Sequence, residues 1–553
     1  MLAVLAACGG GSDSEGGGTT PPPAGQVAIS GRITFDRVPV GTTSTADVGL
    51  NYAAIVQAPA RGVLVEAISD AGAVLTSTST DENGRYSLNV AQNTQVLIRA
   101  KAQMVRTGSP SWNFTVRDNV RANALYTLDG NAASSGAANS ERNLRAPSGW
   151  NDSSKEYSAE RAAAPFAVLD AVYQSVDLVL STQPSASFPA LDLFWSPENV
   201  PSVPGADGLP VPATGEIGST FFLPTKLGTA EPGLYVLGEE NSDTDEYDKH
   251  VIAHELGHYY QSRFSRDDSI GGAHDMGSKL DPRVAFSEGW ANVYAAMAYR
   301  DPVYRDSFGN AQAGYFGFSV ETTPSSISAP QFAGWFSEFS VHGILYDIYD
   351  NAVDGADSIE LGFTPLHTMM TQDLKNTSAF TTIYPALKSL RDRNISQAAV
   401  IQQLANNQAI SLGSNDDFGT SENSGGNNGG DASNLPLYAP VVTNGSLTNV
   451  VSKSISGGSY NTLGVNKYLV FDLTGASNNV TITAAAATAG RDADIVLYSK
   501  GTLVGQRGNG NGNETLSVGS LAAGKYVLEV YDAGNRDGSS RADSTIQVRV
   551  TAN

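Results

Sequence analysis

The fold of the central region is decided by one stretch of the chain, Val251-Ile252-Ala253-His254-Glu255-Leu256-Gly257-His258-Tyr259-Tyr260. Its two histidines are four residues apart, so on a helix their imidazoles project from one face and can converge on a single Zn²⁺. Glu255 follows the first histidine, which places its carboxylate beside the metal, where it can take a proton from an activated water. The stretch therefore predicts a ligand pair and a general base on one helix.

The third ligand is expected from a second helix. Gln261 and Phe264 stand where a metzincin would have its glycine and third histidine, which excludes that class. The segment from Ala285 to Ala295 has helical periodicity, and its Glu288 is flanked by apolar residues. An unpaired carboxylate would be costly in such a setting, so Glu288 is the best third ligand. Asn292, one turn further on, can accept a hydrogen bond from the far nitrogen of a ligand histidine.

Around this site the spacing of apolar residues predicts a mixed helix-and-strand segment that is followed by a mostly helical one. Periodicity predicts a helix from Ala162 to Leu180, followed by strands at residues 191–195 and 234–237. From Asp245 to about Ile410 apolar residues recur at three- and four-residue spacing. We therefore expect an α+β domain over residues 161–412, with a mixed lobe before a helical lobe.

The motif His254-Glu255-x-x-His258, followed by a helix with Glu288, resembles the gluzincin superfamily of zinc metallopeptidases, thermolysin-like enzymes among them. The resemblance covers roughly residues 190–410. It implies a zincin-like catalytic domain in which His254, His258 and Glu288 bind zinc and Glu255 is general base and acid. In many members the residue matching Asn292 is an aspartate, so its role in polarising a ligand histidine is expected to be weaker here.

Hydrolysis of an amide also needs a group that stabilises negative charge on the carbonyl oxygen. The family's order of elements implies His342, on a helix from Ser340 to Asp350, with Tyr346 as the reserve. A purely structural His342 remains the alternative. His274 lies in a glycine-rich loop between the two ligand helices and is expected to line the cleft or bind substrate. His250 is expected to be an outer neighbour of the site, and His367 to be structural.

Two all-β sandwiches are expected to flank this domain. Residues 26–125 contain short alternating strands separated by turns, and the hairpin from Thr80 to Leu88 resembles transthyretin-type, carboxypeptidase regulatory-like domains. Residues 126–160 and 413–435 are polar or low in complexity and are predicted to be linkers. Residues 436–553 return to strands whose spacing fits a jelly-roll-like sandwich.

The C-terminal sandwich resembles the bacterial pre-peptidase C-terminal domain, on the segments Asp492 to Tyr498 and Leu521 to Val530. Such domains accompany secreted peptidases. Asp492 and Asp494 could bind Ca²⁺, or could simply be solvated carboxylates near a turn.

The charge and the single cysteine bear on partners and location. With 34 Lys+Arg against 56 Asp+Glu in 553 residues, the formal net charge is −22, and such a surface repels nucleic acid. Cys8 follows Leu5-Ala6-Ala7 and precedes a Gly/Ser/Pro-rich tether that extends to residue 25. This segment resembles a bacterial lipobox, which implies a lipid anchor. No run of about 18 apolar residues occurs, so membrane contact is expected through that anchor alone.

These patterns predict a zinc-dependent endopeptidase that hydrolyses extracellular protein or peptide substrates, either anchored to the bacterial cell envelope or secreted. The substrate is expected to lie extended against an edge strand, for which we choose Leu234 to Leu237. Two alternatives stay open at this stage. One is a cell-surface binding or adhesion lipoprotein with an inert zinc domain, and the other is a zinc amidase acting on glycopeptide or cell wall.

Overall fold

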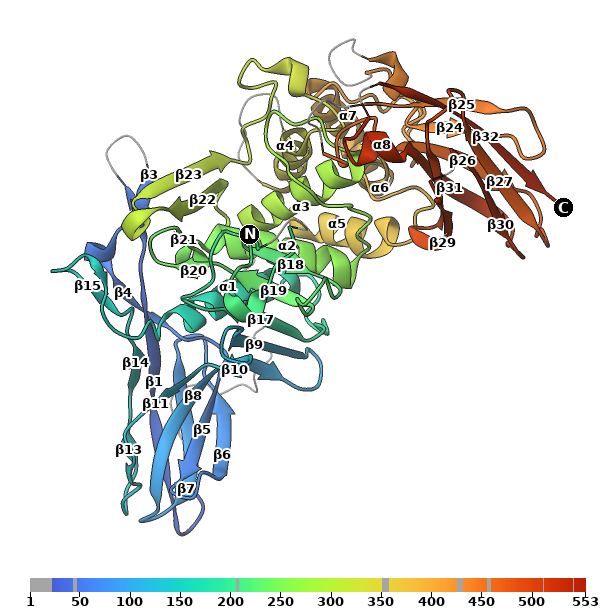
Figure 1. Ribbon diagram of the computed structural model, residues 1–553. Coiled ribbons are helices and arrows are strands. Elements are labelled where there is room, and N and C mark those ends of the chain that lie inside the picture. Colours follow the sequence, from blue (N-terminus) through green and yellow to red (C-terminus); the bar gives the residue numbers. More distant parts are fainter. Residues whose placement is uncertain are drawn as a thin grey trace.

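The computed structural model describes residues 22–42, 47–204, 208–350, 358–424, 431–454, 459–510, 512–540 and 542–553. The expected lipobox at Cys8 lies outside them. Figure 1 shows three parts in chain order: a β-rich N-terminal part in blue, a largely helical centre in green to orange, and a C-terminal sandwich in red. Among the described helices, none combines the length and apolar character needed to cross a bilayer.

The N-terminal part is a sandwich, as the alternating pattern predicts. One layer is built on β1 (Gln26–Arg37), which pairs antiparallel with β4 (Val56–Pro59) and β7 (Arg85–Ala91). The other layer contains β5 (Val63–Ser69), β6 (Val74–Ser79), β8 (Gln95–Arg106) and β9 (Trp112–Asp118). Alternate side chains of β8 are buried between the layers, because successive residues of a strand point to opposite faces.

The prediction that residues 126–160 form a linker is wrong. This segment adds short strands to both layers: β11 (Thr127–Asp129) and β12 (Ala133–Ser134) pair with β8, whereas β13 (Ser140–Glu141) and β14 (Leu144–Ala146) run parallel to β1. Its small polar side chains suggested a linker, but its backbone groups pair with the strand edges of the sandwich.

The N-terminal sandwich is not separate from the centre, because one sheet runs through both. Strand β9 pairs in parallel with β17 (Leu191–Trp195), which pairs in parallel with β19 (Gly233–Val236). The outer strand is β18 (Phe221–Leu223), antiparallel to β19. The predicted strands at 191–195 and 234–237 are therefore present, but β19 is an inner strand. The expected edge strand from Leu234 to Leu237 is corrected to β18.

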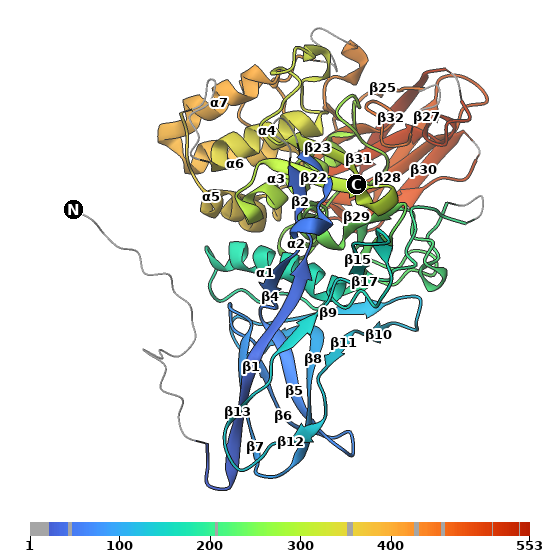
Figure 2. The same ribbon diagram turned by 90° about the vertical axis from the view of Figure 1, so that its left-hand side faces the viewer.

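Helices lie above this sheet in Figure 2, with the C-terminal sandwich beside them. The helix predicted from Ala162 to Leu180 is α1 (Ala164–Leu180). The later helices are α2 (Lys249–Phe264), α3 (Pro282–Tyr299), α4 (Glu338–Tyr349), α5 (Phe363–Thr368), α6 (Ile383–Arg393) and α7 (Ala398–Asn407). The stretch expected to be mostly helical also contains a β-hairpin, β22 (Val303–Phe308) and β23 (Gly314–Ser319). This hairpin lines a cleft next to α2.

The C-terminal part is a two-layer sandwich, as predicted. One layer has the strands β24 (Tyr438–Pro440), β26 (Lys467–Leu473), β31 (Gly524–Asp532), β28 (Ala493–Ser499) and β29 (Thr502–Arg507). The other has β25 (Thr448–Ser452), β32 (Ser544–Ala552), β27 (Val480–Ala486) and β30 (Asn513–Val518).

The outer face of the first layer packs on the helical centre. Tyr438 and Tyr468 belong to the same buried apolar cluster as Phe380, whose ring lies 5.2 Å from that of Tyr468. The described part of the second expected linker also packs on the centre, since Tyr384 donates a hydrogen bond to Glu422 and the Trp335 indole donates to Ser424 O. The C-terminal sandwich is therefore docked on the helices rather than tethered beside them.

Candidate metal centre

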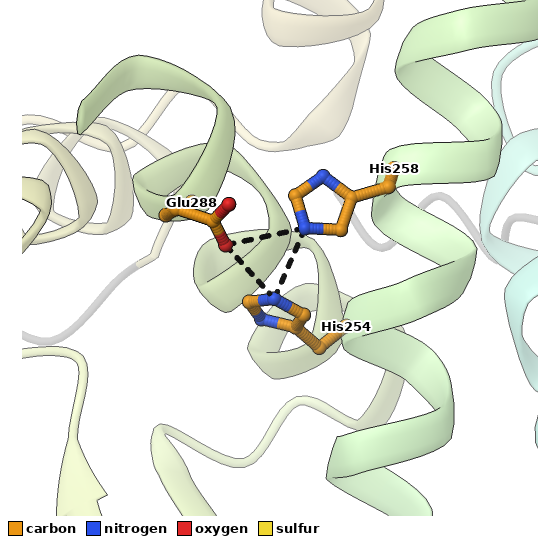
Figure 3. A group of neighbouring side chains, drawn as sticks. All are labelled: His254, His258 and Glu288. Atoms are coloured by element: carbon orange, nitrogen blue, oxygen red, sulfur yellow. Dashed lines mark hydrogen bonds and ion pairs between the residues drawn. The ribbon is translucent and has the colours of Figure 1, made fainter. Parts of the chain in front are cut away.

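Two neighbouring helices bring three side chains together. His254 and His258 come from one face of α2, and Glu288 comes from α3, as Figure 3 shows. The two histidine Nε2 atoms are 3.2 Å apart. Glu288 Oε2 lies 3.3 Å from Nε2 of His254 and 3.2 Å from Nε2 of His258. The three atoms thus form a nearly equilateral triangle.

The triangle fits a tetrahedral zinc site. With ligand bonds of about 2.0–2.1 Å, neighbouring ligand atoms of a tetrahedron are about 3.3 Å apart. Glu288 is 7% exposed, and its Oε2 has no hydrogen-bond partner among the described residues. A buried carboxylate oxygen without a donor is costly unless a cation satisfies it. Two imidazoles and a carboxylate are also a donor set that zinc accepts.

Hydrogen bonds behind the histidines fix which nitrogen faces the triangle. His254 Nδ1 donates to Asn292 Oδ1 at 2.9 Å, as the sequence predicted for Asn292. His258 Nδ1 lies 3.2 Å from Ser287 Oγ, whose hydroxyl donates to Gln261 Oε1. Both Nε2 atoms are thereby left as acceptors for a metal. Sequence reasoning missed Ser287 and Gln261, although the spacing of three from His258 to Gln261 is that of one helix face.

The electrostatics keep the carboxylate ionised. Burial raises the pKa of Glu288, but His258 and His254 outweigh burial and hold that pKa well below its ordinary value. Burial lowers the pKa of His258, yet the Glu288 carboxylate raises it to about 9. The Glu288 carboxylate is thus ionised, and a metal ion that bound there would take the place of the proton on His258 Nε2.

Glu255 lies beside the triangle and is not part of it. Its Oε2 accepts a hydrogen bond of 2.7 Å from Phe222 N, in the outer strand β18. It lines a cleft of about 560 Å³ together with His254 and Asn292. The carboxylate is therefore held in place, next to His254 and at the wall of the cleft.

The cleft has walls of two kinds. Aromatic side chains of the hairpin and of α4 form one part: Tyr304, Phe316, Phe318 and Phe339. Three carboxylates form another part: Asp243, Asp245 and Asp306, whose oxygens lie within 4.8 Å of one another. The sequence showed Asp243 and Asp245 only as acidic residues near the start of α2, and Asp306 was missed because it lies some 60 residues further on in the unpredicted hairpin.

His342 is not brought to this site. It is fully buried, and its Nε2 lies 3.2 Å from Thr322 O. Its ring packs against Phe339, and burial lowers its pKa to about 3. The cleft formed by the described residues is lined by neither His342 nor Tyr346. The expectation that His342 contacts the substrate is corrected: its helix turns it into the core.

His274 does reach the cleft. Its Nε2 lies 3.4 Å from Glu288 Oε2, and its Nδ1 lies 2.7 Å from Glu338 Oε2. Glu338, the first residue of α4, was missed because the sequence gives no spacing that joins it to the loop. His250 is buried beside Asp301, outside the ligand cluster. His367 is structural, since Tyr260 OH and Gln183 Oε1 lie at hydrogen-bond distance from its ring.

The possible calcium ligands of the C-terminal sandwich also converge. Oxygens of Asp492, Asp494 and Glu514 lie within 4.8 Å of one another. Burial raises the pKa of Asp494 to about 6. A calcium ion at Asp492 and Asp494 stays a prediction.

Comparison with known proteins relates the centre of the chain to peptidases. Residues 238–406 match the family model described as the Mycolysin C-terminal domain, and this range contains His254, Glu255, His258 and Glu288. No curated protein matches the chain.

The chain also has likenesses to solved structures. The pre-peptidase C-terminal domain of collagenase from Bacillus anthracis is 17% identical over 20% of this chain and 93% of that one, with a TM-score of 0.16. The secreted serine protease VesC from Vibrio cholerae is 14% identical over 22% of this chain and 25% of that one, with a TM-score of 0.15.

Proposed function

We propose that the chain is a zinc-dependent endopeptidase of the gluzincin type, acting on extracellular protein or peptide substrates. The observation that carries this proposal is the triangle of His254, His258 and Glu288, which has tetrahedral spacing. Its His254 lines an open cleft together with Glu255. The match of residues 238–406 to the Mycolysin C-terminal domain supports it.

The three triangle residues would hold the metal, which when bound polarises a carbonyl group and lowers the pKa of water. Glu255 accepts the proton of the attacking water and then delivers it to the leaving amine. The hydrogen bond from Phe222 N keeps that carboxylate pointed into the cleft. Asn292 and Ser287 hold the two imidazoles in the required tautomer.

The substrate lies extended along β18. In the described part of the chain β18 pairs with β19 on one side, and its Phe222 contacts the base. Main-chain pairing with a strand edge reads the peptide backbone and is largely indifferent to side chains, which suits hydrolysis of varied proteins.

The protein acts outside the cytoplasm. A lipid on Cys8 would anchor it to the cell envelope, and without that lipid it would be secreted. Labelling of the full-length protein with a radioactive fatty acid, in wild type and in Cys8→Ala, distinguishes the two.

Metal analysis and hydrolysis of casein by the purified protein test the proposal. We expect one zinc per chain, loss of zinc in His258→Ala, and retention of zinc with at least 10²-fold lower turnover in Glu255→Gln, because the base is lost while the ligands remain. Full activity of Glu255→Gln would refute the mechanism. Zinc binding with no hydrolysis of casein would favour an inert adhesion domain, and cleavage of peptidoglycan alone would favour the amidase.

A further inference from the structure

The segment that carries His274 is held by the C-terminal sandwich. It joins α2 to α3, and its residues 270–278 form no helix or strand. Leu280 pairs with Thr462 in an antiparallel bridge, closed by hydrogen bonds from Leu463 N to Lys279 O and from Asp281 N to Asn461 O. The end of the loop is thus fixed to the other domain by backbone bonds.

A second contact holds the loop next to His274 itself. The side-chain amide of Asn461 donates a hydrogen bond of 2.9 Å to Ala273 O. At Gly272 a Cβ atom would lie 2.6 Å from the Asn461 amide nitrogen, and the backbone has φ of +107°. Only glycine adopts this conformation readily and lets Asn461 approach so closely.

A buried group of charged side chains joins the start of α3 to the C-terminal sandwich. Arg283, at the start of α3, lies 3.0 Å from both Asp281 and Glu529, and all three side chains are at most 2% exposed. Tyr468 OH also donates to Asp281. Glu529 and Tyr468 belong to the C-terminal sandwich, so this domain supports both the loop and the helix that carries Glu288.

His274 lies beside the triangle and lines the cleft. Its Nδ1 is bonded to the buried Glu338, and its Nε2 faces the cleft at 3.4 Å from Glu288. It groups with Glu288 and Glu338, outside the triangle formed with His254 and His258. A carboxylate lies beside each ring nitrogen, Glu338 at Nδ1 and Glu288 at Nε2, and this arrangement favours the imidazolium form, in which both nitrogens carry protons. The Nε2–H group then lies next to the triangle, where negative charge develops on the carbonyl oxygen of a peptide under attack.

We propose that the C-terminal sandwich completes the site: Asn461 holds the loop so that His274 donates a hydrogen bond from Nε2 to the carbonyl oxygen of the cleaved peptide. His274 is then a catalytic residue, and Asn461 and Glu338 are positioning residues. The inference rests on the proposed peptidase function, and it makes the C-terminal sandwich part of the enzyme rather than an accessory to it.

His274→Gln tests the catalytic role, and as His274 is partly exposed the variant is expected to fold. We expect unchanged zinc content, a fall in kcat of about 10²-fold with little change in KM, and weaker binding of a peptide phosphonate by a similar factor, since its tetrahedral oxygens imitate the transition state. Loss of zinc would make His274 a ligand instead, and unchanged phosphonate affinity would refute its contact with the oxyanion.

Asn461→Ala tests the role of the sandwich, with Asn449→Ala as the matched control on an exposed position of the same domain. We expect faster hydrogen exchange of the amides in residues 270–278 and a fall in kcat of about 10-fold in Asn461→Ala, with neither effect in the control. Gly272→Ala disrupts the same contact from the loop side. It should change the exchange rates and kcat as much as Asn461→Ala does.

The two proposals fail in different ways. If the wild-type protein binds no zinc or cleaves no peptide bond, the proposed function fails. If the wild type is active and Asn461→Ala keeps wild-type exchange rates and kcat, the function stands and the role of the sandwich is refuted.

Discussion

Asn292 accepts the Nδ1 hydrogen bond of His254 through a neutral side-chain amide. A neutral acceptor polarises the imidazole less than a carboxylate does, so Asn292→Asp should tighten zinc binding. Asn292→Ala removes the acceptor and should weaken zinc binding about 10- to 100-fold. Competition with a chromogenic chelator measures both constants. Equal affinities in the three proteins would show that this hydrogen bond does not tune the site.

For His342 we predict an effect on stability and none on zinc binding or catalysis. Its ring packs between aromatic residues and bonds Thr322 O in the core. His342→Phe should keep zinc content and kcat/KM, but lower the free energy of unfolding by about 1–3 kcal/mol, because Thr322 O loses its donor. Urea unfolding and casein hydrolysis measure the two effects. A large loss of kcat with unchanged stability would restore a catalytic role for His342.

These residues show what the sequence could predict about the site. Spacing within one helix predicts the histidine pair and Glu255, because a helix converts a separation of four into a shared face. Glu288 could be chosen from its buried flank. The role of His274 was left open between lining the cleft and binding substrate. Its partner Glu338 and the orientation of His342 depend on how separate elements pack, and local spacing carries no information on that.

Helices α2 and α3 must approach closely for the triangle to form. A Cβ on Gly257 would lie 2.9 Å from the backbone Cα of Ala291, so Gly257→Ala should force the two helices apart and lower zinc affinity. Gly475→Ala is the control, because a Cβ there meets no atom within 4 Å. Zinc titration followed by circular dichroism separates a displaced helix from an unfolded one. Wild-type affinity in folded Gly257→Ala would contradict the close contact.

Two carboxylates that line the cleft, Asp306 in β22 and Asp243 near the start of α2, make the stability of the protein depend on pH. Burial raises the pKa of Asp306 to about 6 and that of Asp243 to about 7, against about 3.9 in an unfolded chain. The folded protein therefore keeps protons that the unfolded chain has lost, and stability falls as the pH rises from about 4 to 7. Asp306→Asn should be more stable than wild type at pH 8 and similar at pH 4.

Melting temperatures measured from pH 4 to pH 8 test this pH dependence. The proteins are measured without metal, because pH-dependent loss of zinc would also change the melting temperature. Parallel curves for wild type and Asp306→Asn would show that Asp306 does not titrate in this range. Asp177→Asn, on an exposed position of α1, is the control and should follow the wild-type curve.

Elements with a strong local pattern could be predicted from the sequence, and elements made by pairing could not. Helix α1 and strands β17 and β19 follow their periodicity. The short strands of residues 126–160 have too few residues to show alternation, and they exist because β1 and β8 offer edges to pair with. Strand β18 is also short, and only its pairing with β19 shows that it is the outer strand of the sheet.

At the scale of the whole molecule, the sequence predicted three domains separated by linkers, whereas in the structure the three parts are packed together. The sheet that begins in the N-terminal sandwich ends at β18 beside Glu255. The C-terminal sandwich shares a buried apolar cluster with the helices. Each sandwich is thus joined to an element beside the cleft, the N-terminal one through the shared sheet and the C-terminal one through the loop that carries His274. A linear division of the sequence cannot reveal these connections.

The buried ion group of Asp281, Arg283 and Glu529 should therefore couple the C-terminal sandwich to the centre energetically. Glu529→Ala leaves Arg283 with one buried partner, and we expect a loss of about 3–5 kcal/mol in the free energy of unfolding. Asp472→Asn, which breaks an exposed ion pair with Lys525 in the same sandwich, should cost about 1 kcal/mol or less. Urea unfolding followed by circular dichroism gives both values, and zinc release recorded in the same titration should coincide with the main transition. If Glu529→Ala unfolds the sandwich first while the centre keeps its zinc, the two parts are independent, and the support of the cleft by the C-terminal sandwich falls with that result.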